Sequence, residues 1–277
     1  MAQRHATRRA QDPRTGEARE DCVAVEEPLE IRVAGDPIAV TMRTPGEDGD
    51  LALGFLYAEG VIQRAADVGS LAHCGRPGEE GYGNVLEIAP APGVALDVER
   101  VDATRRGALT TSACGVCGRR TIGDLLQGCG PLEEGPVVPL PVVTAAVAAL
   151  RSAQRVFART GGTHAAAAFT RDGRRLVVRE DVGRHNAVDK VVGALLRERH
   201  VGATRAGADG PALLVVSGRS SFELVQKAAR ARIPVVASVS APTSLAVDLA
   251  LAMNVTLAGF VRGDAVNVYA HPGRLAR

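Results

Sequence analysis

The sequence predicts an α/β protein in which a smaller N-terminal α+β domain precedes a layered C-terminal α/β domain, and two observations carry this prediction. Two short runs, Leu213–Val216 and Val235–Ala237, are apolar throughout, and each is followed by helix-like sequence. Strands without alternation are typical of a sheet that is covered on both faces. Near the N-terminus, in contrast, apolar and polar residues alternate over 29–33 and 38–42, which indicates a β-hairpin.

The N-terminal part divides into a tail and a small α+β unit. Residues 1–20 are polar and Arg-rich without apolar periodicity, so we expect a disordered tail. Gly35-Asp36 supplies turn residues between the two strands of the hairpin. The segment Asp50–Gly60 begins with a capping residue and ends with a glycine, as a helix does, and Asn84–Ile88 has the pattern of a strand. We therefore place an α+β domain over 21–130.

A dense group of prolines separates this unit from a second domain. The segment 131–141 contains four prolines, which break any regular element and indicate a connection. We expect the second domain over 137–277. Its expected elements are a helix over 144–159, a hairpin over 165–178, a helix over 187–196, the two buried strands with their helices, and a terminal strand pair near 255–257 and 266–268.

Composition and charge exclude several classes of function. Only 3% of the 277 residues are aromatic and Trp is absent, so a nucleic-acid platform of stacked aromatic side chains is disfavoured. The net charge of +2 comes entirely from residues 1–20, which argues against a uniform polyanion-binding surface. No apolar run approaches the roughly 20 residues of a membrane span. We expect a cytoplasmic protein with neither a nucleic-acid nor a membrane partner.

The sharpest local motif is a pair of cysteines. Cys114 and Cys117 lie in Ser112-Ala113-Cys114-Gly115-Val116-Cys117-Gly118, followed by Arg119 and Arg120. Cations and aligned backbone N–H groups stabilise a thiolate, so at least one of these cysteines should be reactive. The pair alone leaves three uses open: a structural zinc site, which lacks an obvious second ligand pair, a dithiol redox switch, or sulfur transfer through a persulfide.

Two stretches of the C-terminal domain could hold an anion. Glu180–Lys190 lies at a strand-to-helix junction, where His185 falls near a helix N-terminus, although Asp181 could equally act only as a cap. Ser217-Gly218-Arg219-Ser220-Ser221 follows a buried strand and opens a helix. Because ligands gather at the carboxyl ends of such strands, this turn and Gly161-Gly162-Thr163-His164 could line one cleft. Neither a P-loop nor a Gly-x-Gly-x-x-Gly fingerprint is present.

Taken together, the motifs resemble those of the FdhD/NarQ family, the formate dehydrogenase accessory sulfurtransferases. The resemblance rests on six segments in matching order: Leu51–Gly60, Ser112–Gly118, Gly161–His164, Glu180–Lys190, Ser217–Phe222 and Phe260–Gly263. It covers nearly everything from residue 21 onward and leaves the tail uncovered. Six ordered motifs are far more specific than a single pair of cysteines.

The resemblance implies a sulfurtransferase that works as a sulfur carrier. A cysteine desulfurase would load Cys114 with a persulfide, with Cys117 as its partner. The sulfur would then pass to the molybdenum of a bis-molybdopterin guanine dinucleotide cofactor, of which GDP is a mimic. The implied client is the catalytic subunit of formate dehydrogenase, and a homodimer is expected.

The resemblance also implies a fold and a cofactor site. The domain over 137–277 would be similar to the cytidine deaminase fold. The family's cofactor-binding stretch matches Phe260-Val261-Arg262-Gly263-Asp264-Ala265, to which the anion motifs add Ser217, Gly218, Arg219 and His185. A deaminase reaction is disfavoured, because none of the six histidines is followed two residues later by Glu. No metal site is predicted. The alternative function is a non-catalytic chaperone that binds the molybdenum cofactor.

Overall fold

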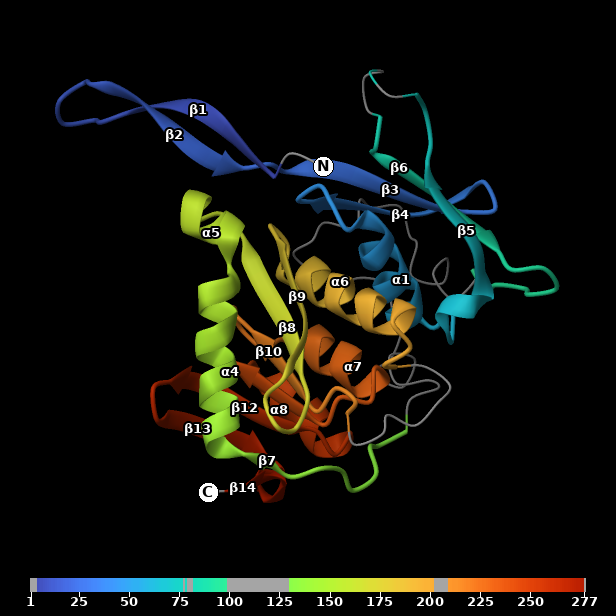
Figure 1. The fold of residues 1–277 in the computed structure, drawn as a ribbon, viewed down its shortest axis with the longest axis vertical. Coiled ribbons are helices and arrows are strands. Elements are labelled where there is room, and N and C mark those ends of the chain that lie inside the picture. Colours follow the sequence, from blue (N-terminus) through green and yellow to red (C-terminus); the bar gives the residue numbers. More distant parts are fainter. Residues whose placement is uncertain (1–3, 77, 79–81, 99–129, 202–208, 277) are drawn as a thin grey trace.

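The computed structural model describes residues 4–76, 78, 82–98, 130–201 and 209–276 (Figure 1). Its centre is a six-stranded sheet in the order β13-β12-β11-β10-β8-β9. The strands are β8 (His164–Phe169), β9 (Arg175–Asp181), β10 (Leu213–Val216), β11 (Val235–Ser238), β12 (Thr256–Arg262) and β13 (Ala265–Ala270). The strands β10, β11 and β12 run parallel, and the other three join antiparallel to their neighbours.

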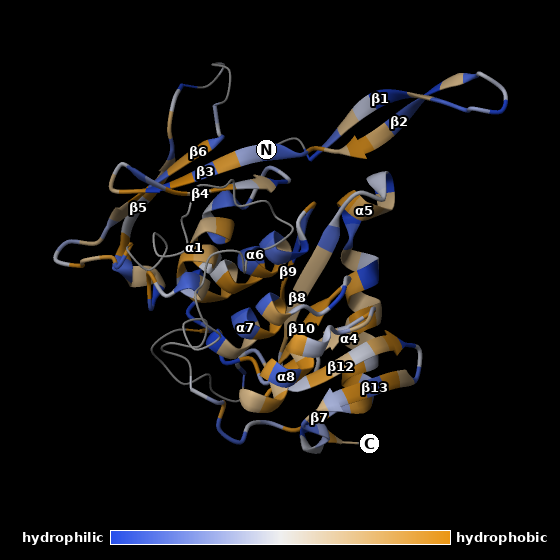
Figure 2. Cartoon of the chain, turned by 180° about the vertical axis from the view of Figure 1, so that it is seen from behind, coloured by the Kyte–Doolittle hydropathy of each residue, from blue (hydrophilic) through white to orange (hydrophobic). Residues whose placement is uncertain are grey.

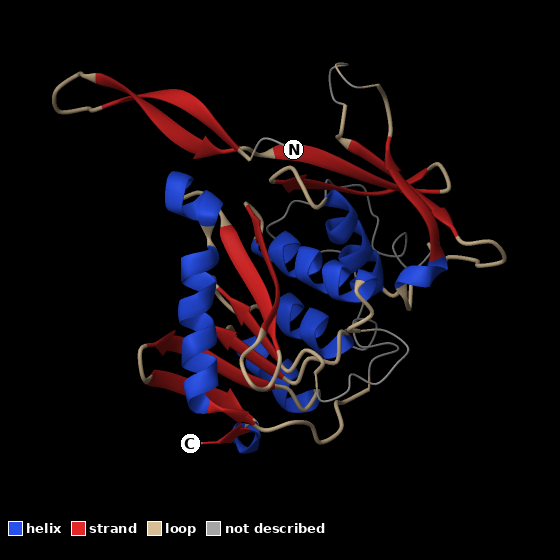
Figure 3. Cartoon of the chain, viewed as in Figure 1, coloured by secondary structure: helices blue, strands red, loops and turns tan. Residues whose placement is uncertain are grey.

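Helices cover both faces of this sheet, which confirms the predicted α/β class (Figure 3). Helix α4 (Leu140–Ala153) packs on one face, and α6 (Arg184–Arg197), α7 (Phe222–Arg230) and α8 (Ser244–Ala252) cover the other. Every residue of β10 and β11 is buried, as their unalternating sequences predict. Figure 2 shows hydrophobic residues concentrated on these strands and on the helix faces that cover them.

The helix predicted over 144–159 is divided into two. Helix α4 ends at Ala153. The next residue, Gln154, has a non-helical ψ of 78°, and a second helix, α5, covers Arg155–Thr160. Glu180 on β9 accepts hydrogen bonds from the backbone N–H groups of Val156 and Phe157, at 2.9 and 2.8 Å. Glu180 therefore satisfies the first N–H groups of α5 and stabilises the break between the two helices. Because Glu180 lies on a different element, the sequence around residue 154 does not indicate the break.

A second sheet forms the N-terminal part, in the order β4-β3-β6-β5. Its strands are β3 (Glu27–Val33), β4 (Asp36–Arg43), β5 (Val68–His73), which follows a 3-10 turn over Ala65–Asp67, and β6 (Val85–Pro90). The predicted hairpin corresponds to β3 and β4, and the predicted strand near residue 86 is β6. Strand β5 was not predicted, because it is mostly exposed and lacks apolar alternation.

Helix α1 (Asp48–Glu59) ends at Gly60 as predicted, but Asp50 is not its cap. Asp50 is fully buried inside the helix, and its carboxylate pairs with Arg179 at 2.7 Å and with Arg197 at 2.8 Å. Burial of a carboxylate costs free energy, and the two guanidinium groups offset that cost. Asp50 therefore joins the N-terminal part to β9 and α6.

Helices α1 and α6 cross at backbone contact. A Cβ atom on Gly54 would lie 1.9 Å from the carbonyl oxygen of Asp189, and one on Gly193 would lie 1.8 Å from that of Asp50. Only glycine permits such an approach. One apolar core runs from Leu29 in β3 through this crossing to the central sheet, so it is continuous across the predicted boundary at 131–136. The division into two domains stays a prediction.

The structure corrects the prediction of a disordered tail over 1–20. Strands β1 (His5–Gln11) and β2 (Ala18–Ala24) pair antiparallel and project from the body as a two-stranded ribbon (Figure 1). Arg4 at its root pairs with Glu47. Much of the ribbon is exposed, so its strands show no apolar alternation, and the pattern that normally reveals strands was missing.

Short elements complete the fold. Strands β7 (Val138–Pro139) and β14 (Leu275–Ala276) pair in parallel, and a 3-10 turn covers Pro272–Arg274. The terminal strand pair is present as β12 and β13, which are longer than predicted. Within the described ranges, no helix has the length and apolar character that crossing a membrane requires.

Candidate functional site

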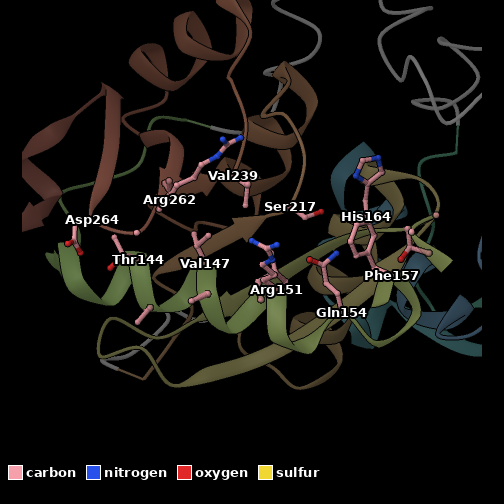
Figure 4. Close-up of a pocket in the computed structure, with 18 residues that line it drawn as sticks. Thr144, Val147, Arg151, Gln154, Phe157, His164, Ser217, Val239, Arg262 and Asp264 are labelled. Carbon is pink, nitrogen blue, oxygen red and sulfur yellow. The ribbon is translucent and has the colours of Figure 1, made fainter. Parts of the chain in front are cut away.

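A cavity of about 1000 Å³ lies at the carboxyl ends of β10, β11 and β12, against helix α4 (Figure 4). Its volume is at the upper end of the roughly 300–1000 Å³ typical of small-molecule sites. The lining residues are Thr144, Ala145, Val147, Ala148, Leu150, Arg151, Gln154, Phe157, Gly161, Gly162, Thr163, His164, Ser217, Val239, Val261, Arg262, Gly263 and Asp264. The cavity therefore occupies the edge of an open α/β sheet at which ligands usually bind.

Backbone bonds and tight turns hold the strand ends in place. Ser217 follows β10, and its N–H donates to the carbonyl of Ala165 at 2.9 Å while its Oγ accepts from the N–H of Ala165 at 2.9 Å. After β12 the chain reverses at Gly263, whose φ of +53° favours glycine. These local constraints bring Ser217 and the β12–β13 turn to one cavity from positions far apart in the sequence.

Two arginines give the cavity its positive charge. Arg151 on α4 and Arg262 at the end of β12 both line it, and Figure 4 shows them reaching it from different elements. Within the described part of the chain, neither guanidinium has a carboxylate at salt-bridge distance. An arginine fork without a partner matches the geometry of phosphate oxygens. Asp264 is the one carboxylate among the described lining residues.

His164 contributes a neutral imidazole at neutral pH. Burial lowers the pKa of His164 below its usual 6.5, and the nearby cations of Arg184 and Arg219 lower it further, while Asp181 opposes them. A Cβ on Gly218 would lie 3.2 Å from Nδ1 of His164, so this glycine lets the imidazole pack close to the turn after β10. The neutral ring can donate one hydrogen bond and accept another.

The loop at Gly161-Gly162-Thr163 is fixed by tertiary contacts. Gly161 ends α5 with φ of +65°, and a Cβ on Gly162 would lie 3.1 Å from Cβ of Ala24 in the ribbon. The hydroxyl of Thr163 donates to Glu180 at 2.9 Å. Glu180 thereby holds both ends of α5 and positions the wall of the cavity that precedes His164.

The cavity brings together only part of the predicted cofactor site. Ser217, Val261, Arg262, Gly263 and Asp264 line it. Gly218 contacts the ring of His164 from outside the lining, and Arg219 is exposed nearby. That Gly218 and Arg219 bind the cofactor stays a prediction.

Three other predicted residues do not line the cavity. Phe260 has a left-handed backbone with φ of +52° and is 42% exposed, and Ala265 is exposed at the start of β13. His185 is buried beyond the turn, with Nε2 3.0 Å from the hydroxyl of Ser221 and 3.3 Å from Glu223. A left-handed backbone is a rare conformation for a bulky residue, and it marks Phe260 as a constrained position at the rim of the sheet.

Sequence reasoning missed the contribution of α4. Thr144, Val147, Arg151 and Gln154 all line the cavity, at helical spacings of three and four residues. That spacing indicates one helix face, but a mixed polar and apolar face with a single arginine does not by itself distinguish a ligand wall from a solvated surface. The signal becomes specific only when the strand ends are known to lie opposite.

The predicted sulfur-carrying residues, Cys114 and Cys117, lie outside the described residues. Among the residues that the structure does describe, no three His, Cys, Asp or Glu side chains gather as metal ligands. The zinc and redox alternatives for the cysteine pair stay predictions. Cys22 and Cys74 are free cysteines and are half-buried.

Comparison with known proteins agrees with the sequence motifs. A profile described as "FdhD/NarQ family" matches residues 24–276, which is most of the chain. The chain belongs to the FdhD/NarQ family. The match begins at the last residue of β2, so most of the ribbon lies before it.

Two curated relatives carry the name "Sulfur carrier protein FdhD". The chain is 60% identical over 262 residues to the protein from Anaeromyxobacter dehalogenans strain 2CP-C, covering 95% of this chain and 91% of the relative. It is 50% identical over 265 residues to the protein from Mycobacterium tuberculosis strain H37Rv, covering 93% and 92%. Proteins that are this similar over nearly their full length share one fold.

A solved structure supports the architecture. A crystal structure from Desulfotalea psychrophila, described as a candidate formate dehydrogenase accessory protein, superposes with a TM-score of 0.73 at 24% identity. The match covers 98% of each chain. At this level of identity it establishes the shared fold and no shared ligand.

Proposed function

We propose that this chain is a cytoplasmic sulfur carrier that accepts sulfur from a cysteine desulfurase and passes it to the bis-molybdopterin guanine dinucleotide cofactor of formate dehydrogenase. Family membership and two relatives named as sulfur carriers support the general role. The observation that carries the cofactor half of the proposal is the cavity of about 1000 Å³ at the strand ends, lined by Arg151 and Arg262.

The residues present fit a guanine nucleotide. Phosphate oxygens would bind the two guanidinium groups, which have no carboxylate partners among the described residues. Ser217, Thr163 and neutral His164 offer further hydrogen bonds around the same space. We place the GDP portion of the cofactor, which is the substrate that receives sulfur, in this cavity. The cytidine-deaminase-like character of the domain over 137–277 belongs to the same proposal.

The chemistry of loading needs one reactive thiol. The thiolate of Cys114 attacks the outer sulfur of the desulfurase persulfide; a new S–S bond forms on Cys114, and the desulfurase cysteine leaves as a thiolate. Release of that outer sulfur as sulfide requires two electrons. The thiol of Cys117 supplies them when it attacks the inner sulfur and forms a disulfide with Cys114, so the atoms and electrons balance.

Loading is tested by incubating the chain with a cysteine desulfurase and cysteine and measuring the intact mass. We expect wild type and Cys117→Ala to gain the mass of one sulfur atom and Cys114→Ala to gain none. A full load on Cys117 in the Cys114→Ala variant would reverse the assigned roles.

The test of a non-catalytic chaperone is separate. A Cys114→Ala/Cys117→Ala variant keeps the cavity but cannot carry sulfur, so under our proposal it fails to mature formate dehydrogenase. Maturation by this double variant at the wild-type level would favour the chaperone instead. Proposed homodimer formation is measured independently by the molar mass of the full chain in solution.

A further inference from the structure

A second cavity, separate from the proposed cofactor site, lies where the ribbon root meets α4, α5 and β9. Its volume is about 500 Å³, within the range of small-molecule sites. We call it the arginine pocket, because four arginines line it: Arg4, Arg155, Arg175 and Arg179. The two cavities share no lining residue, and the arginine pocket includes Arg4, which lies before the segment that matches the family.

Two of the four arginines are already neutralised. Arg4 pairs with Glu47, whose second oxygen, Oε2, is buried. Arg179 pairs with the buried carboxylate of Asp50 at 2.7 Å. These contacts fix the walls of the pocket, and they leave little charge on Arg4 and Arg179 for another molecule to bind.

The remaining acid of the pocket, Glu180, is also satisfied. It accepts from the N–H groups of Val156 and Phe157 and from the hydroxyl of Thr163, at 2.8 to 2.9 Å. It is only 8% exposed. These neutral donors fix the carboxylate but do not cancel its charge. Four arginines against Glu47 and Glu180 still leave the lining two positive charges in excess.

The positive charge that is available to a ligand is therefore that of Arg155 and Arg175. Both side chains are exposed, one at the start of α5 and the other at the start of β9. In the part of the chain that the structure describes, neither has a carboxylate at salt-bridge distance. Two free guanidinium groups on different elements, at one concave and largely polar site, fit the oxygens of an anion.

We propose that the arginine pocket binds a small hydrophilic anion that carries phosphate or carboxylate groups, held by Arg155 and Arg175. Its volume of about 500 Å³ favours a small molecule over an extended chain. The site does not depend on the sulfur-carrier proposal, since it uses neither the cysteine pair nor any residue that lines the other cavity.

Calorimetric titration of the full chain with inorganic pyrophosphate and with citrate, at low and constant ionic strength, tests the proposal. We expect at least one of them to bind with a dissociation constant of about 1 mM or tighter. An Arg155→Gln/Arg175→Gln variant should lose at least tenfold in affinity. Pyrophosphate binding alone would assign a phosphate ligand, and citrate binding alone a polycarboxylate.

Two matched variants separate this site from general charge and from the other cavity. Arg171→Gln removes an exposed arginine of the β8–β9 turn that lines neither cavity, and affinity should be unchanged. Under our account the proposed cofactor cavity also binds phosphate oxygens. The titration is therefore repeated with Arg151→Gln/Arg262→Gln, which removes that site and should leave binding at the arginine pocket unchanged. The proposal is overturned if neither anion binds wild type, or if the loss follows Arg171 or Arg262 rather than Arg155 and Arg175.

Discussion

Replacing Gly54 by alanine tests whether the backbone contact of α1 with α6 holds the two parts of the chain together. The new Cβ would lie 1.9 Å from the carbonyl oxygen of Asp189, whereas ordinary contact requires about 3.5 Å. The helices would have to separate by about 1.5 Å, and both neighbours of the clash are backbone atoms that cannot rotate away. Overpacking of this kind costs about 1–3 kcal/mol or occasionally more.

The greater helix propensity of alanine offsets part of this cost, by up to about 1 kcal/mol. We therefore expect Gly54→Ala to lower the free energy of unfolding by about 2 kcal/mol, measured by urea denaturation followed by circular dichroism. Gly49→Ala is the matched control on the same helix. Its Cβ would meet only the flexible side chain of Leu71, at 3.3 Å. Since alanine has the same propensity advantage there, this variant should be as stable as wild type or more stable by up to about 1 kcal/mol. Equal stability of Gly54→Ala and wild type would refute the backbone contact.

Three further predictions concern the proposed cofactor cavity and Glu180, which fixes Thr163 in the cavity wall. Arg262→Ala should weaken GDP binding at least tenfold in calorimetry. Unchanged affinity would show that GDP does not bind in this cavity. Glu180→Ala should cost about 2–3 kcal/mol in urea denaturation, because three donors lose a buried acceptor, whereas Glu180→Gln, which keeps one, should lose less. His164 should titrate below 6.5 by NMR, and Arg184→Gln should raise that value. Because the pKa of His164 is lower in the folded chain, the unfolded chain binds more protons. The contribution of His164 to stability is therefore present above pH 6.5 and is lost as the pH falls through the folded pKa. A measured pKa at or above 6.5 contradicts this.

The central sheet could be predicted because its sequence signals are local. Leu213–Val216 and Val235–Ala237 are short apolar runs bounded by turn residues, and each became a fully buried strand. Gly60 and Gly161 end helices with positive φ, as helix-terminating glycines do. In these places a few neighbouring residues decide the conformation, so the sequence pattern is sufficient.

The ribbon and the role of Asp50 could not be predicted in the same way. The ribbon depends on cross-strand backbone pairing and on the anchoring of Arg4 by Glu47, which no apolar periodicity reveals. Asp50 has the residue type and position of a helix cap, but Arg179 and Arg197 draw it into a buried ion pair. Arg4 and Glu47 lie 43 residues apart, and Asp50 lies 129 and 147 residues from its two arginines, so neither contact can be inferred from neighbouring sequence.

In the candidate site, too, local sequence signals predicted some residues, whereas tertiary contacts determine others. Ser217 was identified because ligands bind at the carboxyl ends of buried strands, and Arg262 because its stretch matches the cofactor-binding segment of the family. Arg151 was missed, because only the packing of α4 against that sheet places it opposite them. Sequence motifs thus identified one wall of the cavity, and tertiary packing supplied the other.

The most direct test of the central claim is the delivery of sulfur by the loaded chain. Chain loaded with persulfide is mixed with formate dehydrogenase that holds a sulfur-free cofactor, and formate oxidation is then measured. We predict activation by loaded wild type, no activation by Cys114→Ala, and weak activation by Arg262→Ala that carries a normal load. Activation by Cys114→Ala to the wild-type level would contradict the account.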